Sequence, residues 1–171
     1  MEIFIFFVII TVFFLCGYAL TDAGTKEIEY AKESLNWPKT NGHIINSNLV
    51  HSRVEVKDKN DPLYKKITYS YMPKITYIYH VDRFKYHSSV IELFSDPKTF
   101  EFTDKSEAEV FTDQLYPKGQ MVDVFYDPLK PSVGVLKPGN VQHGKNSLWA
   151  GYACYGVAGF ISLLVLMSTI F

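Results

Sequence analysis

Residues 116–139 read YPKGQMVDVFYDPLKPSVGVLKPG, and this stretch decides the expected fold. It contains two short runs of β-like composition, residues 121–126 and 132–136. Asp127 and Pro128 stand between them, because proline presets φ for a turn and an aspartate side chain accepts hydrogen bonds from nearby backbone N–H groups. The turn residues on the outer sides of the two runs are Pro117, Gly119, Pro138 and Gly139. The stretch therefore predicts a hairpin that completes a β-rich domain.

The charged residues are confined to the middle of the chain. All 17 Lys and Arg lie between Lys26 and Lys145, and outside that interval only Glu2 and Asp22 carry a charge. The net charge of -1 also lacks the basic balance that nucleic-acid binding usually needs. Two apolar ends therefore flank one polar region, and we expect no nucleic-acid partner.

The first apolar end, residues 3–20, reads IFIFFVIITVFFLCGYAL and holds no charged residue. This length is sufficient for a transmembrane helix. A cleaved signal peptide is the alternative, but it would require a basic start and a small-residue cleavage site, and Met1 and Glu2 provide no basic side chain. We therefore expect an uncleaved membrane anchor, followed by a juxtamembrane helix over residues 21–36.

The second apolar end, residues 147–171, predicts a second transmembrane helix. Trp149, Tyr152 and Tyr155 lie in its first turns, where aromatic side chains sit well at the level of the lipid headgroups. Small residues recur at every fourth position, which indicates either a helix-packing face or the ordinary abundance of small residues in such helices. These small residues are Ala150, Cys154, Ala158 and Ser162.

Two antiparallel spans would place both termini on one side of the membrane and the polar region on the other. The lysines that flank the spans lie on the side of the polar region, so the positive-inside rule favours a cytoplasmic domain. The rule is weak for long loops, and the sequence leaves the side of the membrane open. It also leaves open whether Cys16 and Cys154, which fall at similar depth, form a bridge or only pack between helices.

Between the spans, residues 37–140 predict a small β-rich (α+β) domain, sandwich or barrel-like, with one short helix. In the most regular strand, Ile75, Tyr77, Tyr79 and Val81 share one face. Its hairpin partner places Tyr86 near Tyr79 or Val81. The expected strands are 43–50, 52–56, 74–82, 86–94 and 99–102, and the expected helix is 106–115, with Asp104 as its cap.

The sequence contains no GxSxG, HExxH, CxxC or phosphate-loop motif, and its five histidines have no metal-ligand spacing. We therefore predict no catalytic residue, no metal site and no cofactor. An enzyme would require His80, Asp82 and His87 to converge. One further group indicates either an aromatic groove or the half-buried rim of a small core: Tyr64, Tyr69, Tyr71, Tyr77, Tyr79 and Tyr86.

Over residues 37–139 the chain resembles the domain-of-unknown-function family DUF3592. The residues that carry the resemblance are Trp37, Gly42, Tyr77, Tyr79, Val81, Tyr86, Ala108, Tyr116, Gly119, Tyr126, Asp127, Pro128, Pro131, Leu136, Pro138 and Gly139. The resemblance implies a membrane span followed by a β-rich domain, and it implies no catalytic residues. Arg83 departs from the family pattern, which usually has Gly in this hairpin turn, and leaves the turn type open.

These features predict a non-enzymatic accessory or structural subunit of a membrane protein assembly. Its partners would be other membrane protein subunits and the lipid bilayer. The alternative is a membrane-tethered module that binds a glycan, a lipid headgroup or an extended peptide on a tyrosine-lined sheet face. The sequence does not decide whether such a small ligand exists.

Overall fold

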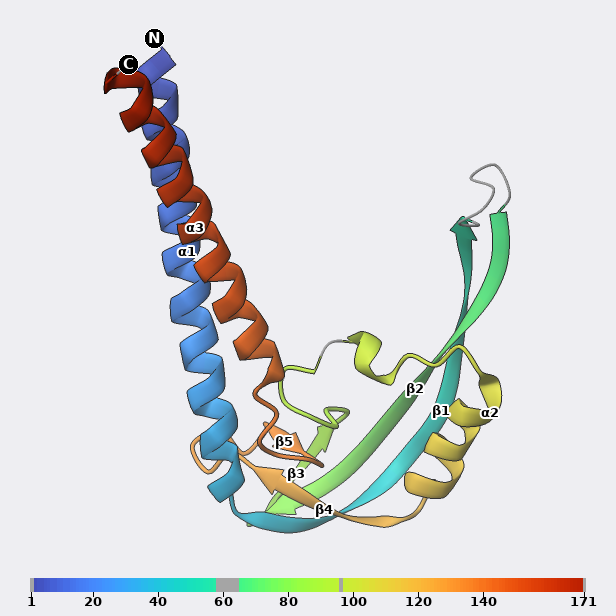
Figure 1. Cartoon of the computed structure of the whole chain (residues 1–171). Coiled ribbons are helices and arrows are strands. Elements are labelled where there is room, and N and C mark those ends of the chain that lie inside the picture. The colour runs from blue at the N-terminus through green and yellow to red at the C-terminus, as the bar shows by residue number, and fades with distance from the viewer. Residues whose placement is uncertain (1, 58–64, 96, 171) are drawn as a thin grey trace. The chain divides into compact units, whose positions relative to one another are not determined.

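The computed structural model describes residues 2–57, 65–95 and 97–170 (Figure 1). The chain divides into two compact units. One unit joins the two ends of the chain, Met1–Glu33 and Asn140–Phe171, and the other is Ser34–Gly139. The first unit is a pair of helices and the second is the β-rich domain.

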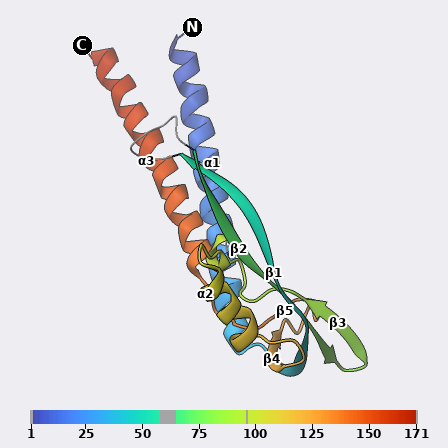
Figure 2. The same ribbon diagram turned by 90° about the vertical axis from the view of Figure 1, so that its right-hand side faces the viewer.

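The helix pair consists of α1 (Glu2–Glu33) and α3 (Gln142–Ile170). The helices are antiparallel, with both chain termini at the same end of the pair (Figure 2). Both are long and apolar enough to cross a membrane. Helix α1 continues through the region predicted as a separate juxtamembrane helix, and the 3₁₀ turn η1 (Ser34–Asn36) follows it. This helical stretch stops before Trp37, because the residue that precedes a proline disfavours the α conformation.

Glycines separated by seven residues bring the two helices into backbone contact. A Cβ atom added to Gly24 would lie 2.7 Å from the carbonyl oxygen of Gly144. One added to Gly151 would lie 3.0 Å from the carbonyl oxygen of Gly17. Ala158, seven residues beyond Gly151, is also buried. A seven-residue repeat stays on the contact seam of a left-handed helix pair, which explains why these positions hold small residues.

This seam differs from the helix face predicted from every fourth residue. Of those four residues, Ala158 is buried and Cys154 is half-buried, whereas Ala150 and Ser162 are exposed. The physical reason is that a four-residue step rotates about 40° around an α-helix, so a four-residue repeat drifts away from a straight seam. Cys16 is exposed and both cysteines are free thiols, so the structure contains no bridge between them.

The β-rich domain contains one open, antiparallel five-stranded sheet, in the order β3-β2-β1-β4-β5. The described strands are β1 (Lys39–Lys57), β2 (Lys65–Val81), β3 (Phe84–Ser88), β4 (Met121–Tyr126) and β5 (Gly134–Val135). A single sheet replaces the predicted sandwich or barrel, because β1 and β2 run on as long strands instead of breaking to start a second sheet. The predicted closing hairpin is present, since β4 has the predicted bounds and pairs with β5.

Strand β1 is continuous where two short runs were predicted, at 43–50 and 52–56. Its register against β2 shifts between Ile44 and Asn46. One extra residue in a strand forms a β-bulge, which bends the strand and moves the following side chains to the opposite face. The inward face of β1 therefore changes from even to odd positions beyond the bulge.

Strand β3 ends at Ser88, six residues before the end of the predicted strand at 86–94. The Ser88 hydroxyl donates to the carbonyl oxygen of Gly134 at 2.8 Å and accepts from the N–H of Val90 at 3.2 Å. These side-chain bonds replace ladder bonds and turn the chain out of the sheet. The strand predicted at 99–102 is reduced to a single bridge between Phe102 and Tyr71, preceded by the 3₁₀ helix η2 (Pro97–Phe100).

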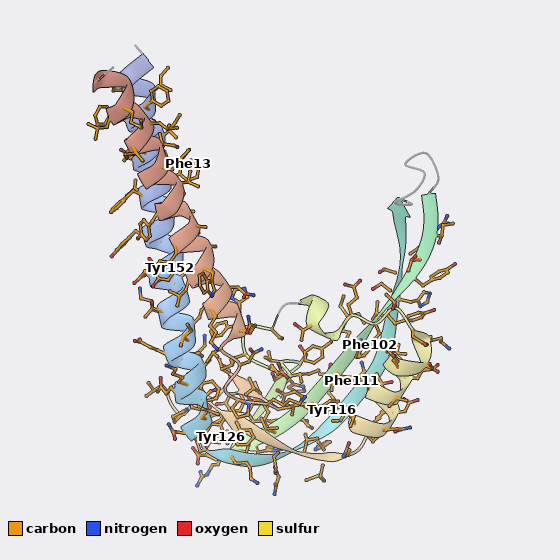
Figure 3. The ribbon with its side chains drawn as sticks, viewed as in Figure 1. Phe13, Phe102, Phe111, Tyr116, Tyr126 and Tyr152 are labelled. Carbon is orange, nitrogen blue, oxygen red and sulfur yellow. The ribbon has the colours of Figure 1, made fainter. Side chains whose placement is uncertain are left out.

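The short predicted helix is present as α2 (Lys105–Val110), continued by the π-helical turn η3 (Phe111–Leu115). Its predicted cap is confirmed, because the Asp104 side chain accepts from the N–H of Ser106 at 2.8 Å. Hydrogen bonds from Ser106 also lower the pKa of the Asp104 carboxyl below its usual value. The Phe111 ring lies 5.2 Å from the Tyr116 ring (Figure 3). The helix thus adds an aromatic cluster beside the sheet.

The core of the domain lies on the inward face of the sheet, where β2 contributes Ile75, Tyr77 and Tyr79. Tyr79 pairs with Tyr86 across the β2–β3 hairpin, with ring centroids 5.7 Å apart, as the alternation predicted. The buried cluster consists of Ile44, Ile75, Tyr77, Tyr79, Ile91, Val124 and Leu136.

Candidate docking surface

Two of the tyrosines predicted to line a ligand groove are core residues. Tyr77 and Tyr79 are fully buried. The Tyr77 hydroxyl lies 2.7 Å from the carbonyl oxygen of Gly134, and the Tyr79 hydroxyl donates to that of Pro131 at 2.8 Å. Burial raises the pKa of Tyr77, and it raises the pKa of Tyr79 to about 12. These side chains fasten the closing hairpin to the sheet and offer no surface to a ligand.

The glycine before β4 and the glycine within β1 each have a steric role. A Cβ at Gly42 would lie 2.7 Å from a methyl group of Val124 and 2.8 Å from the carbonyl oxygen of Ile78. Gly119 has φ +87, a conformation that other residues adopt only with strain. Both positions therefore serve the architecture of the sheet.

The turn after β4 is organised by Asp127, which is buried. Its carboxylate accepts from the N–H of Leu129 at 2.8 Å and of Lys130 at 3.2 Å. Pro128 lies within this turn, and the last residue of β4, Tyr126, donates its backbone N–H to the carbonyl oxygen of Pro38 at 3.1 Å. Asp127 thus acts as a turn former.

The two ends of the β-rich domain are held together by a partly buried hydrogen bond. The N–H of Gly139, which follows Pro138, donates to the Ser34 hydroxyl at 2.9 Å. Gly139 has φ +85, and a Cβ there would lie 2.5 Å from the Leu35 side chain. Trp37 is buried close by in sequence. These contacts close the domain where the chain enters and leaves it.

The conformation of the β2–β3 turn explains why Arg83 can stand where the family pattern usually has Gly. The left-handed residue of this turn is Asp82, with φ 55, and Arg83 is not among the described residues with positive φ. Aspartate tolerates this conformation better than most residues that carry a Cβ. A glycine at the Arg83 position is therefore unnecessary in this turn.

The predicted cluster of His80, Asp82 and His87 stays spread along the same hairpin. His80 pairs with Lys85 across the strands, and His87 pairs with Ile78. Both histidines are exposed. Within the residues that the structure describes, no group of three or more His, Cys, Asp or Glu is placed to hold a metal ion.

An open groove of about 490 Å³ lies beside β2, lined by Met72, Pro73, Phe100 and the 89–95 segment. Its lining includes none of the tyrosines predicted for a ligand-binding face. Among those tyrosines, Tyr64 lies outside the described residues. The groove therefore does not reproduce the tyrosine-lined pocket of the alternative prediction.

Strands β1 and β2 extend beyond the rest of the sheet as a two-stranded arm, which we define as residues 50–57 of β1 and 65–72 of β2 (Figure 1). Strand β4 pairs with β1 only at residues 39–43, and β3 pairs with β2 only at residues 77–81. Among the described residues beyond these pairs, β1 and β2 alone continue as strands, joined at Tyr71 by a single bridge to Phe102. A two-stranded ribbon without further cover has little stability of its own in water.

An apolar row runs along β2 from the core onto this arm. Alternate residues of a strand share one face, and the register shift lies on β1, so the inward row of β2 is unbroken. Ile75 is buried in the core, whereas Tyr69 is 50% exposed and Ile67 is 45% exposed. Across the pair, Arg53 stands opposite Tyr69 on the same face. We call this surface the arm face: His51, Arg53, Ile67, Tyr69 and Tyr71.

Tyr69 and Tyr71 are predicted from the sequence as candidates, but the continuous row is not, because the predicted strand begins only at residue 74, directly after Pro73. Tyr71 exchanges backbone hydrogen bonds with Phe102, away from β1. Pro73 is two residues further along, so its missing N–H faces the same open side and costs no bond to β1. The signal that reveals the row is the presence of apolar side chains or proline at every odd position from Ile67 to Val81.

A family model, described as Domain of unknown function (DUF3592), matches residues 40–141. No curated protein matches the chain. The matched residues include the whole sheet apart from the first residue of β1, and they confirm the resemblance inferred from the tyrosine hairpin and the closing turn. The chain belongs to the DUF3592 family.

Proposed function

We propose that this protein is a non-enzymatic accessory subunit of a membrane protein assembly, anchored by α1 and α3 and docked to a partner through the arm face. The observation that carries the proposal is the exposure of Ile67 and Tyr69 at the outer end of a row that is otherwise core. Exposed apolar surface that continues a core favours cover by another protein.

The helix pair supports the membrane location. Its contact seam is built from glycine and alanine, while large apolar side chains such as Phe7, Phe14 and Leu163 are exposed. This inverts the arrangement of a water-soluble protein, and lipid is the solvent in which exposed apolar side chains carry no cost. Lysines near the ends of the spans favour a cytoplasmic β-rich domain.

The chemistry of the arm face fits a protein partner. Tyrosine and arginine are enriched in the energetically important parts of protein interfaces, since both combine apolar area with a polar end. The arm face combines Ile67 and the two tyrosines with His51 and with the positive charge of Arg53, which stands opposite Tyr69. The expected complementary surface is therefore apolar, with a carboxylate positioned to meet Arg53.

Purification of the native chain in mild detergent tests the proposal. The full chain should elute with a larger membrane complex, and a double substitution Ile67→Ser and Tyr69→Ser should release it. Leu129→Ser is the matched control, because Leu129 is 90% exposed in the β-rich domain but lies away from the arm in sequence. Recovery of the wild-type chain only as a free monomer would overturn the proposal, as would equal recovery of partners with both variants.

A further inference from the structure

The glycine contacts fix which residues of the two helices lie at the same level. Gly17 meets Gly151, and seven residues along, Gly24 meets Gly144. In an antiparallel pair with this register, Tyr18 of α1 lies level with Ala150 of α3. Tyr18, Trp149 and Tyr152 therefore occupy one level of the helix pair.

These three aromatic side chains point outward. Trp149 is 75% exposed, Tyr18 is 64% exposed and Tyr152 is 58% exposed. Tyr155, which the sequence placed with them, instead packs inside the pair. Its ring lies 5.3 Å from the Phe14 ring, and it is the first side chain that a Cβ at Gly17 would meet.

The polarity of the helix pair changes at this aromatic level. Toward the β-rich domain the helices carry polar pairs: Lys26 bonds to Asp22 at 2.6 Å, and His143 Nδ1 lies 2.8 Å from a Glu27 carboxylate oxygen. In the other direction, residues 3–18 and 150–171 contain no charged side chain. Such a step from charged to uncharged side chains within about one helical turn matches the boundary between water and lipid.

We infer that the surface of the bilayer crosses the helix pair at Tyr18, Trp149 and Tyr152, whose side chains contact the lipid headgroups. Tryptophan and tyrosine suit this region because one end of each side chain is apolar and the other forms hydrogen bonds. The inference rests on the membrane location in the proposed function. It adds that α1 leaves the bilayer near Tyr18 and continues in water, with the start of α3, as a helical stalk that extends about 22 Å to Glu33.

The stalk has the contacts of a helix pair in water. The Glu27 carboxylate joins the helices through His143, and its Oε2 atom lies 3.5 Å from the Ser147 hydroxyl. Helix α3 begins with a side-chain cap, since the N–H of Gln142 donates to the Asn140 side chain at 3.0 Å. The Glu27 contacts do not suit a hydrocarbon environment, where an ionised carboxylate is costly.

Fluorescence of the full chain in phosphatidylcholine vesicles tests the inference. Trp37→Phe leaves Trp149 as the single tryptophan, and the difference between wild type and Trp149→Phe gives the same signal if Trp37→Phe impairs folding. Lipids brominated near the carbonyl should quench Trp149 at least twofold more than lipids brominated near the chain end. Stronger quenching by the deep probe, or quenching by aqueous iodide alone, would overturn the inference.

Thiol labelling separates this inference from the membrane location itself. In vesicles opened on both sides to a charged maleimide, and with Cys16 at the boundary replaced by Ser, Thr25→Cys in the stalk should react readily, while the native Cys154 should react at least tenfold more slowly. Equal labelling of both thiols would overturn both claims. A protected Cys154 together with a protected Thr25→Cys would overturn only the proposed boundary, because the spans would still lie in lipid.

Discussion

The helix pair and the β-rich domain place their large side chains in opposite ways. In the helix pair, glycines meet backbone to backbone, and the phenylalanines and leucines point outward. In the domain, tyrosines and isoleucines fill the interior, and the hydroxyls of the core tyrosines donate to backbone carbonyls. Close packing of small residues is favourable between helices in lipid, and burial of large apolar side chains is favourable in water.

The difference has a physical origin. In water, burial of a large apolar side chain contributes about 1.5–3 kcal/mol, so the domain gains from a large aromatic core. In lipid this driving force between helices is absent, and close approach of small residues takes its place. The contrast supports the proposal that the two units lie in different solvents.

The largest expected effect is the loss of a core tyrosine. Tyr77→Ala removes a fully buried ring and its hydroxyl contacts to Val90 and Gly134. We expect the domain to lose about 3–5 kcal/mol of its free energy of unfolding, the usual cost of deleting a buried aromatic side chain. Urea unfolding followed by circular dichroism measures this change. An unchanged urea midpoint would show that the tyrosine core does not stabilise the domain as described.

The second prediction concerns the opposite kind of packing. Gly151→Ile inserts a side chain where a Cβ alone would lie 3.0 Å from the Gly17 carbonyl oxygen. We expect a loss of about 1–3 kcal/mol in the association of the helices, because overpacking forces the backbones apart. Loss of helicity during titration with sodium dodecyl sulfate measures the association. Gly156→Ile is the matched control, since a Cβ at Gly156 meets no atom within 4 Å, and equal effects of the two substitutions would contradict the glycine seam.

A smaller effect is expected at the turn after β4. Asp127→Ala removes the acceptor for the N–H groups of Leu129 and Lys130 and should cost about 1 kcal/mol of stability. Asp127→Asn, which keeps an acceptor oxygen, should retain most of it. Thermal unfolding measures stability, and recovery of the partner complex measures function. A fully folded Asp127→Ala chain that had lost its partner would show a direct role in docking.

The smallest effect at neutral pH is the contribution of tyrosine ionisation. Burial raises the pKa of Tyr79 from 10.0 to about 12, so the folded state holds this proton more tightly than the unfolded state. Ionisation therefore leaves the stability of the domain unchanged below pH 10 and lowers it as the pH rises toward 12. Absorbance of tyrosinate should show Tyr79 ionising after the exposed tyrosines, and Tyr79→Phe should remove one tyrosine from this late step while the buried Tyr77 still ionises late. Ionisation of all tyrosines together near pH 10 in the folded chain would contradict the buried core.

Much of the β-rich domain could be predicted because its signals are local. The turn residues around β4 and the alternation of Ile75, Tyr77 and Tyr79 set the closing hairpin and the inward face of the sheet. The extent of β1 and β2 could not be predicted in the same way. It depends on the direction in which the missing N–H of Pro73 points, which only the pairing with β1 determines.

The helix seam and the arm face could not be predicted from the sequence, for related reasons. Whether Ala150 or Gly151 faces α1 depends on the register of two helices far apart in the chain. Whether Tyr69 is covered depends on where β3 and β4 stop, since Tyr69 and the buried Tyr77 are the same residue type on the same face of β2. Tertiary structure, and not local preference, decides both.

Site-specific photo-crosslinking at Tyr69 in intact membranes tests the docking account most directly. A photoreactive side chain in place of Tyr69 should give one discrete crosslinked partner, and the same group in place of the exposed Leu129 should give none. Absence of a crosslink at position 69, or the same products from both positions, would contradict the account.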